Sequence, residues 1–199
     1  MNEQSTKERL LEAAIVMINE KGEAGVRVEE LLREVGVSAP TMYHHFGNRE
    51  GLILAAQVER FIRTLRTDFP IVIAAFNRSE TVEDLKEAVR IAVTFRGDAS
   101  RMERQMQRLN ALGSAYARPE LAAGIVKAHE DIVRQVADAM RPFQEKGMIR
   151  ADIDLEMVVA WFNGTVLGAQ LLEIAPSTLD ISKWAEIMTD AVEHILFGT

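Results

Sequence analysis

The sequence predicts an all-α protein with an amino-terminal three-helix head on a helical body. Two observations predict this class. Apolar residues recur at three- and four-residue spacing along most of the chain, and no stretch alternates apolar and polar residues as a half-buried strand does. In addition, 48% of the 199 residues are hydrophobic, which is enough to bury a full core.

The first two helices of the head are bounded by capping residues. Ser5 and Glu8 form a capping box that begins the first helix, and Gly22 ends it. The run from Val28 to Val35 predicts the second helix. Gly36 then supplies the left-handed backbone that ends a helix.

A short third helix is predicted directly after this glycine. Ser38 caps it, and Pro40 is tolerated in its first turn. Met42 and Phe46, four residues apart, seal it against the second helix. The hydrogen-bonding side chains that then point elsewhere are Thr41, Tyr43 and His44. Two helices joined by a glycine-containing turn, with a polar outer face on the second, are typical of a helix-turn-helix that reads the major groove of DNA.

The fourth helix connects the head to the body. Asn48 caps it, and its apolar positions run to about Phe69, before Pro70. The apolar segment 71–76 is interpreted as a continuation or as a short helix. Thr81 and Asp84 cap the helix that follows.

Two further helices are predicted in the middle of the body. One covers 101–112, and its inward residues are Met102, Met106 and Leu109. After a connection at 113–118, Pro119 opens a long helix that Pro142 kinks or ends.

The last two helices show patterns of helix-on-helix packing. Small residues at every fourth position form a groove that needs a partner helix; they are Ala160, Gly164 and Gly168. The final helix, capped by Ser182, carries a seam formed by Trp184, Ile187 or Met188, Ala191 and Ile195. These residues predict close packing against another helix. The alternative is that both helices only close the core of the single chain.

The stretch around the third helix resembles the signature of the tetracycline-repressor (TetR) family of bacterial transcription regulators. The matching residues are Gly36-Val37-Ser38-x-Pro40-Thr41-Met42-Tyr43-x-His45-Phe46-x-Asn48-Arg49-Glu50-x-Leu52. The resemblance is close over about residues 5–66. It implies a helix-turn-helix DNA-binding domain at 1–48 and a ligand-binding and dimerisation domain at 49–199. It also implies that the last two helices form a four-helix bundle with their copies in a second subunit, so that the groove and the seam described above are the dimerisation surface. The implied function is a homodimeric repressor that a small molecule releases from a palindromic double-stranded DNA operator.

The resemblance also implies which residues touch DNA. Phosphate contacts fall to Tyr43, His45 and Arg49, and contacts to base edges fall to Ala39, Pro40, Thr41 and His44. With the cap residue, the expected DNA-binding set is Ser38, Ala39, Pro40, Thr41, Tyr43, His44, His45 and Arg49. The sequence departs from the family pattern at three positions: Val28 where a capping Thr is usual, Arg49 where Lys is usual, and Gly51 where a helix former is usual.

A small-molecule pocket is expected among flexible and aromatic side chains of the body. The candidate lining residues are Phe95, Met102, Met106, Trp161 and Phe162. Core packing is the alternative for most of them. The run of arginines at 90, 96, 101, 104 and 108 favours an anionic ligand or is a solvated face.

Composition and motifs exclude several other classes. Cysteine is absent, so no disulfide, thiolate metal site or cysteine nucleophile is available, and a reducing cytoplasm is expected. His129-Glu130 opens like a zinc-protease motif, but Val133 replaces the second histidine, so no metal, cofactor or catalytic residue is predicted. The apolar run 157–172 is shorter than the ~20 residues of a membrane span.

The net charge of −7 restricts any basic DNA-binding face to a local surface. The alternatives are a helical binding protein or enzyme with a vestigial head, and an activator that needs no ligand.

Overall fold

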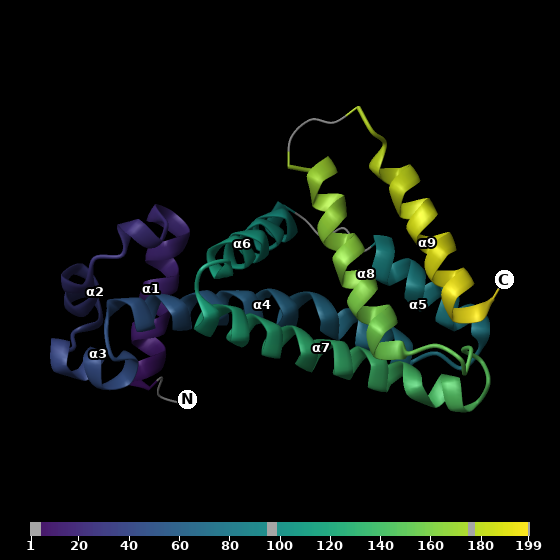
Figure 1. Ribbon diagram of the computed structural model, residues 1–199, viewed down its shortest axis with the longest axis horizontal. Coiled ribbons are helices and arrows are strands. Elements are labelled where there is room, and N and C mark those ends of the chain that lie inside the picture. Colours follow the sequence, from purple (N-terminus) through teal and green to yellow (C-terminus); the bar gives the residue numbers. More distant parts are fainter. Residues whose placement is uncertain (1–4, 95–98, 175–177, 199) are drawn as a thin grey trace. The chain divides into compact units, whose positions relative to one another are not determined.

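The computed structural model describes residues 5–94, 99–174 and 178–198, and all regular elements in these ranges are helices. The α-helices are α1 (Thr6–Lys21), α2 (Val28–Val35), α3 (Ala39–Phe46), α4 (Arg49–Asn77), α5 (Val82–Thr94), α6 (Ala99–Ala115), α7 (Pro119–Glu145), α8 (Leu155–Ala169) and α9 (Ile181–Phe197). Two short 3₁₀ helices are η1 (Glu23–Gly25) and η2 (Gln170–Leu172). The all-α prediction is confirmed (Figure 1).

The chain divides into two compact units. The first unit contains Met1–Arg63 and Asn110–Val126, and the second contains Thr64–Leu109 and Lys127–Thr199. The helix-turn-helix predicted at 1–48 lies inside the first unit. This unit also includes the beginning of α4, the end of α6 and the beginning of α7, so residues distant in the sequence support the head.

The predicted caps of the head are present in the first unit. The Ser5 hydroxyl accepts a hydrogen bond from the Glu8 N–H, and the Glu8 carboxylate accepts one from the Ser5 N–H. Gly36 ends α2 with a φ of 73°. α1, α2 and α3 pack around one apolar cluster, which includes the fully buried Leu10, Leu31 and Met42 (Figure 1). This cluster fixes the three helices relative to one another.

α4 and α7 both continue through a proline, which corrects the predicted end of α4 near residue 69. α4 passes Pro70 and ends at Asn77, so the continuation of 71–76 is confirmed. An internal proline costs about 3 kcal/mol. Burial of Phe76 and partial burial of Phe69 and Val72 in the core of the second unit offset this cost. α7 passes Pro142 in the same way and ends at Glu145.

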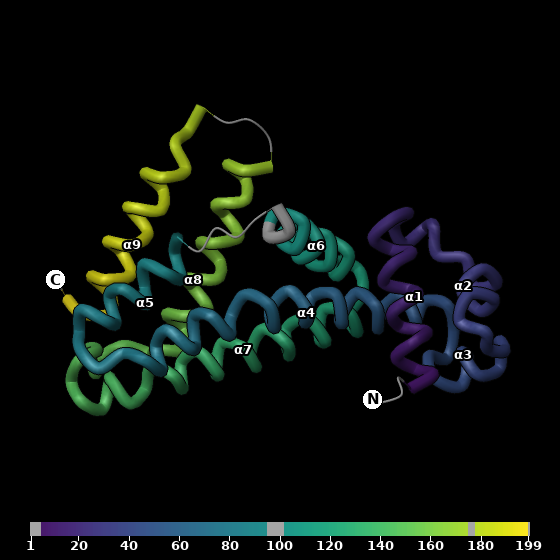
Figure 2. Tube along the Cα trace, turned by 180° about the vertical axis from the view of Figure 1, so that it is seen from behind, coloured from purple at the N-terminus to yellow at the C-terminus, as the bar shows by residue number. Residues whose placement is uncertain are grey.

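The second unit has its own core, to which α5, α8 and α9 contribute. The predicted capping pair of α5 is present: Thr81 Oγ1 accepts from the Asp84 N–H, and Asp84 accepts from the Thr81 N–H. The predicted cap of α9 is wrong by two residues, because Asp180 is the N-cap and accepts a hydrogen bond from the Ser182 N–H. Figures 1 and 2 both show α9 beside α5 and α8.

The buried face of α6 differs from the prediction. Met102, Met106 and Leu109 are only half-buried, and the buried residues of α6 include Gln105, Arg108 and Ala111. The apolar periodicity therefore pointed to the wrong side of this helix. The polar side is buried because it meets an acidic residue of α4, as described below.

Candidate functional site

α3 is anchored on one side and open on the other. Met42 is fully buried, and Phe46 packs against the same cluster, as predicted. Tyr43 is 49% exposed, and Pro40 and His44 are exposed too. Exposed hydrogen-bonding side chains on an anchored short helix can reach into a groove of DNA.

The other predicted residues of α3 are partly engaged with one another. Ser38 is the N-cap residue, but its hydroxyl lies 2.9 Å from the Thr41 hydroxyl and does not accept a backbone N–H. The rings of His44 and His45 meet edge to face, 5.4 Å between centroids. Ala39, Thr41 and His45 are half-buried at the margin of the open face.

Arg49 bonds to the backbone inside the first unit. Its Nε donates to the Val26 carbonyl at 3.1 Å, and its Nη2 donates to the Glu23 carbonyl at 2.7 Å. The first turn of α4 is thereby tied to the segment that leads into α2, which begins after Arg27 without a side-chain cap. The ammonium of a lysine is a single point and does not reproduce this fork. The departure from the family pattern at residue 49 therefore has a local reason.

Position 51, where the family pattern has a helix former, is a glycine because the end of α3 comes very close to it. A Cβ at this position would lie 2.1 Å from the carbonyl oxygen of Phe46, the last residue of α3. The Gly51 N–H donates to the Asn48 side chain, which confirms the predicted cap of α4. Gly51 thus allows a sharp turn between α3 and α4.

Glu23 joins the head to other helices of the first unit. Its carboxylate accepts a hydrogen bond from the fully buried Gln57 at 2.5 Å and pairs with Arg118 at 2.7 Å. Burial raises the pKa of Glu23, but the hydrogen bonds from Gln57 and Arg118 outweigh it and hold the pKa below its ordinary value. Arg60, 5% exposed, donates to Gln57 and Asn110. This network was not predicted, because its members come from four separate parts of the sequence.

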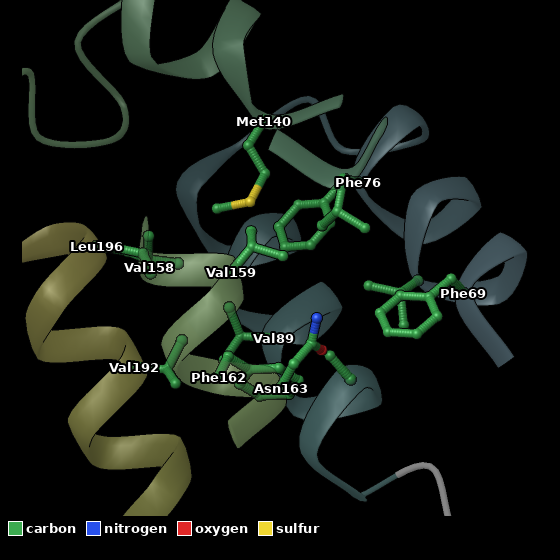
Figure 3. Close-up of a pocket in the computed structure, with 13 residues that line it drawn as sticks. Phe69, Phe76, Val89, Met140, Val158, Val159, Phe162, Asn163, Val192 and Leu196 are labelled. Carbon is green, nitrogen blue, oxygen red and sulfur yellow. The ribbon is translucent and has the colours of Figure 1, made fainter. Parts of the chain in front are cut away.

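The second unit contains an apolar cavity of about 50 Å³. It is lined by Phe69, Val72, Phe76, Val89, Ala92, Val136, Met140, Val158, Val159, Phe162, Asn163, Val192 and Leu196. In Figure 3, Asn163 is the one lining side chain with an amide, among aliphatic, aromatic and thioether groups. Its Nδ2 lies 3.4 Å from His129 Nε2. The cavity can therefore hold a small apolar group.

Only some of the predicted pocket residues lie at the cavity. Phe162 lines the cavity, whereas Met102 and Met106 do not. Trp161 is 43% exposed and lies on the opposite side of α8 from the lining residues. Phe95 lies outside the described residues. Most lining residues were missed because five helices supply them, and periodicity does not fix how helices rotate about their axes.

Three of the clustered arginines are paired within the second unit. Arg90 pairs with Glu83, Glu87 and Glu193. Arg108 Nη2 lies 2.9 Å from Asp68, and Arg104 Nη2 lies 3.2 Å from the same carboxylate. Arg108 is 8% exposed. Burial lowers the pKa of the nearby His129, and the Arg108 charge lowers it further. Asp68 therefore explains why α6 turns its polar side inward.

α8 presents an apolar outer face. Met157 and Trp161 are exposed on it, and a Cβ added at Gly164 or Gly168 would meet no atom within 4 Å. By length and composition alone, residues 155–172 are apolar enough to cross a membrane, and 22% of this segment is buried. On α9, Met188 is buried in the core of the chain, as the alternative interpretation had it, and Ile187 is 70% exposed. Trp184, Ala191, Ile195 and Ala160 are half-buried.

The geometry of the first unit defines a helix-turn-helix protein. A family model described as "Bacterial regulatory proteins, tetR family" matches residues 10–56. The HTH-type transcriptional regulator UidR of Escherichia coli (strain K12) is 29% identical over 155 residues, which cover 77% of this chain and 74% of UidR. Residues 10–56 therefore match the DNA-binding domain of the TetR family, and the chain is similar to transcriptional regulators of that family.

Solved structures show the same fold over nearly the whole length. Salmonella enterica GusR aligns with a TM-score of 0.63 at 23% identity and covers 98% of this chain and 97% of its own. A TetR-family regulator from Cytophaga hutchinsonii aligns with a TM-score of 0.64 at 16% identity, covering 98% and 96%. At these identities the likeness concerns the fold.

Proposed function

We propose that this regulator is a cytoplasmic, non-enzymatic homodimeric repressor. It binds a nearly palindromic double-stranded DNA operator and leaves it when a small molecule occupies the second unit. The observation that carries the DNA-binding part is the two-sided environment of α3. Met42 is fully buried, whereas the next two residues, Tyr43 and His44, are exposed. A major-groove helix needs this combination of a fixed base and an open polar face.

Each residue of the expected DNA-binding set is assigned a role from its chemistry and position. Tyr43 and His45 donate to phosphates, and the Arg49 guanidinium keeps N–H groups beyond the two that bond to Val26 and Glu23. The residues that face base edges are Ala39, Pro40, Thr41 and His44, with Ser38 at the turn. Phosphate contacts set affinity, and base contacts set sequence preference.

Fluorescence anisotropy with DNA from upstream of the regulator's own gene tests this proposal. We expect Tyr43→Ala with His44→Ala to weaken operator binding by about 1–3 kcal/mol or more, since one base contact alone is worth that much. Tyr116→Ala is the matched control, because Tyr116 is 97% exposed in the first unit but lies outside α3. Wild-type affinity in the double variant would refute the DNA-binding role of α3.

The two possible roles of Arg49 can be separated by Arg49→Lys. A lysine keeps the positive charge but cannot bond to both carbonyls. If the fork to Val26 and Glu23 is the main role, this variant lowers the melting temperature of the head and changes the salt dependence of DNA binding little. If the phosphate contact is the main role, Arg49→Ala should reduce the salt slope by about one. An unchanged melting temperature and slope in both variants would exclude both roles.

Homodimer formation is supported by the outer faces of α8 and α9. A helix with an exposed apolar face and open glycines accepts a second helix closely, and a two-fold dimer reads half-sites ~34–36 Å apart. We expect Gly164→Leu and Ile187→Glu to give folded monomers in sedimentation experiments. Val126→Glu is the control, because Val126 is also exposed, at 53%, but lies on α7. A wild-type monomer at micromolar concentration would contradict the dimer.

Release of the operator requires a ligand that distinguishes two conformations. A ligand that prefers the DNA-incompatible conformation ~100-fold weakens operator binding by about 2.7 kcal/mol. An anisotropy titration with ligand separates the possibilities. Loss of binding supports a repressor, and a gain supports an activator. Ligand binding without any operator binding supports a helical binding protein with a vestigial head.

A further inference from the structure

Two cavities of the second unit follow one another along the same three helices. On α5, Ala92 lines the apolar cavity and Val93 lines the second cavity. On α8, Asn163 lines the first and Val166 the second. α9 likewise supplies Val192 and Leu196 to the first and Ile181 and Trp184 to the second. One elongated molecule along α8 would therefore meet both cavities.

The two cavities differ in their chemistry. The first has a volume of about 50 Å³ and an apolar lining apart from the Asn163 amide (Figure 3). The second has a volume of about 20 Å³, and its lining includes the polar side chains of Gln105 and Glu173. Gln105 is 5% exposed. An apolar compartment thus precedes a polar one.

Gln170 is not itself a lining residue, but it lies next to the second cavity in the sequence. It lies between Ala169 and Glu173, both of which line the second cavity. Its side chain is 1% exposed, and neither Oε1 nor Nε2 has a hydrogen-bond partner. A buried amide without hydrogen-bond partners destabilises the folded chain. A ligand with both a donor and an acceptor would remove this cost.

The position of Gln170 agrees with that of the cavities. At about 100° per residue, Asn163, Val166 and Gln170 fall within about 60° of one another around the axis of α8 and η2. Asn163 and Gln170 are seven residues apart, which is roughly 10 Å along the axis. The face that carries both amides is the inward face, because Phe162 and Val166 lie on it.

We propose that the small-molecule ligand is an uncharged amphipathic molecule that occupies both cavities. Its apolar end lies among the residues of the first cavity, and a carboxamide or comparable donor-acceptor group bonds to Gln170 at the other end. This inference rests on the proposed ligand-controlled function. Both cavities are small compared with ligand sites of roughly 300–1,000 Å³. The ligand must therefore move packed side chains, which is how it would favour one conformation over another.

The charges around the site favour a neutral head group. Glu173 repels a carboxylate at the second cavity. Arg104 and Arg108 already pair with Asp68. An ammonium group could pair with Glu173 but would leave the Gln170 Nε2 without an acceptor, since an ammonium only donates.

Isothermal titration calorimetry of the full-length protein with three probes of equal chain length tests this inference. The probes are octanamide, octanoate and octylammonium. We expect octanamide to bind at least ~10-fold more tightly than either charged probe, because one unpaired buried group is worth about 1.4 kcal/mol. Equal or tighter binding of octanoate or octylammonium would overturn the uncharged class.

Gln170→Leu tests the polar end. The variant removes two unpartnered buried atoms, so its melting temperature should not fall, whereas octanamide affinity should fall ~10-fold or more. Gln105→Leu is a second variant with the same expected loss of affinity. The control is Gln135→Leu, since Gln135 is exposed on α7. Wild-type octanamide affinity in both Gln170→Leu and Gln105→Leu would refute the site.

Direct titration separates this inference from the proposed function, because it needs no DNA. If the operator binds and octanamide does not, the ligand assignment fails and the DNA-binding proposal stands. If octanamide binds through Gln170 and no operator binds, the proposed regulatory function fails and the ligand site stands.

Discussion

Replacement of Gly51 by alanine tests the turn between α3 and α4. The new Cβ would lie 2.1 Å from the Phe46 carbonyl oxygen, whereas real Cβ contacts are essentially never closer than 3.0 Å. The two atoms must therefore separate by about 0.9 Å (3.0 − 2.1). The Phe46 oxygen cannot move freely, because it accepts the Asn48 N–H at 2.8 Å. The end of α3 must shift with it.

The expected size of the effect follows from two opposing terms. Steric overpacking costs typically about 1–3 kcal/mol, and contact with a fixed backbone atom belongs at the upper end. Gly→Ala inside a helix ordinarily gains about 1 kcal/mol. We therefore expect Gly51→Ala to destabilise the protein by about 2 kcal/mol. Gly113→Ala in α6, where a Cβ meets no atom within 4 Å, should stabilise it by up to about 1 kcal/mol.

Calorimetry on both variants measures this difference. For a chain of this size 1 kcal/mol shifts the melting temperature by about 2–4 °C, so the variants should differ by about 6–12 °C. Gly51→Ala should also weaken operator binding, because Phe46 is the last residue of α3, whereas Gly113→Ala should not. A Gly51→Ala protein at least as stable as the wild type would refute the reasoning about the close approach.

Three other predictions concern buried polar groups. Asp68→Asn should destabilise the second unit by on the order of 3 kcal/mol, because it removes the charge beside the buried Arg108. Denaturant titration measures this loss of stability. The reasoning fails if Asp138→Asn, which removes the charge of an exposed ion pair, costs as much. The lowered pKa of His129 means that the unfolded chain takes up a proton first as the pH falls below the ordinary value of 6.5. The stabilisation that neutral His129 contributes should therefore be complete above that pH and decrease below it. The melting temperatures of wild type and His129→Gln should converge as the pH is lowered. A constant difference between them at all pH values would exclude a contribution of this residue. Glu23→Ala should leave one N–H of the buried Gln57 amide without its acceptor, at a cost of about 1–3 kcal/mol, and should speed hydrogen exchange in α2. Unchanged exchange rates would show that the network does not support the head.

The head was predictable from the sequence because local signals determine it. Capping residues, a left-handed glycine and short apolar repeats act within one or two turns of helix, and the observed bounds of α2 agree with the predicted 28–35. The predicted capping pairs of α1 and α5 are also present. The cap of α9 was missed because Asp180 and Ser182 are both good N-cap residues, and their order alone does not decide between them.

The body was less predictable because long-range pairing decides which face of a helix is buried. α6 illustrates this. Its methionines suggested an apolar inner face, but Asp68 on α4 draws Arg104 and Arg108 inward. An ion pair between residues 40 positions apart in the sequence leaves no periodic signal in either helix. The same limit applies to the cavity, whose lining comes from α4, α5, α7, α8 and α9.

The departures from the family pattern in the head are connected with one another. α2 begins at Val28 without a side-chain cap, and Arg49 bonds to the two carbonyls just before it. Two residues later, Gly51 permits the turn that brings the start of α4 against the end of α3. The first turn of α4 is therefore bonded to the segment before α2, through Arg49, and lies close to the end of α3, at Gly51. Any movement of that turn should displace both helices together, so a shift of the first turn of α4 would move the exposed face of α3 as a rigid body and would not distort α3 alone.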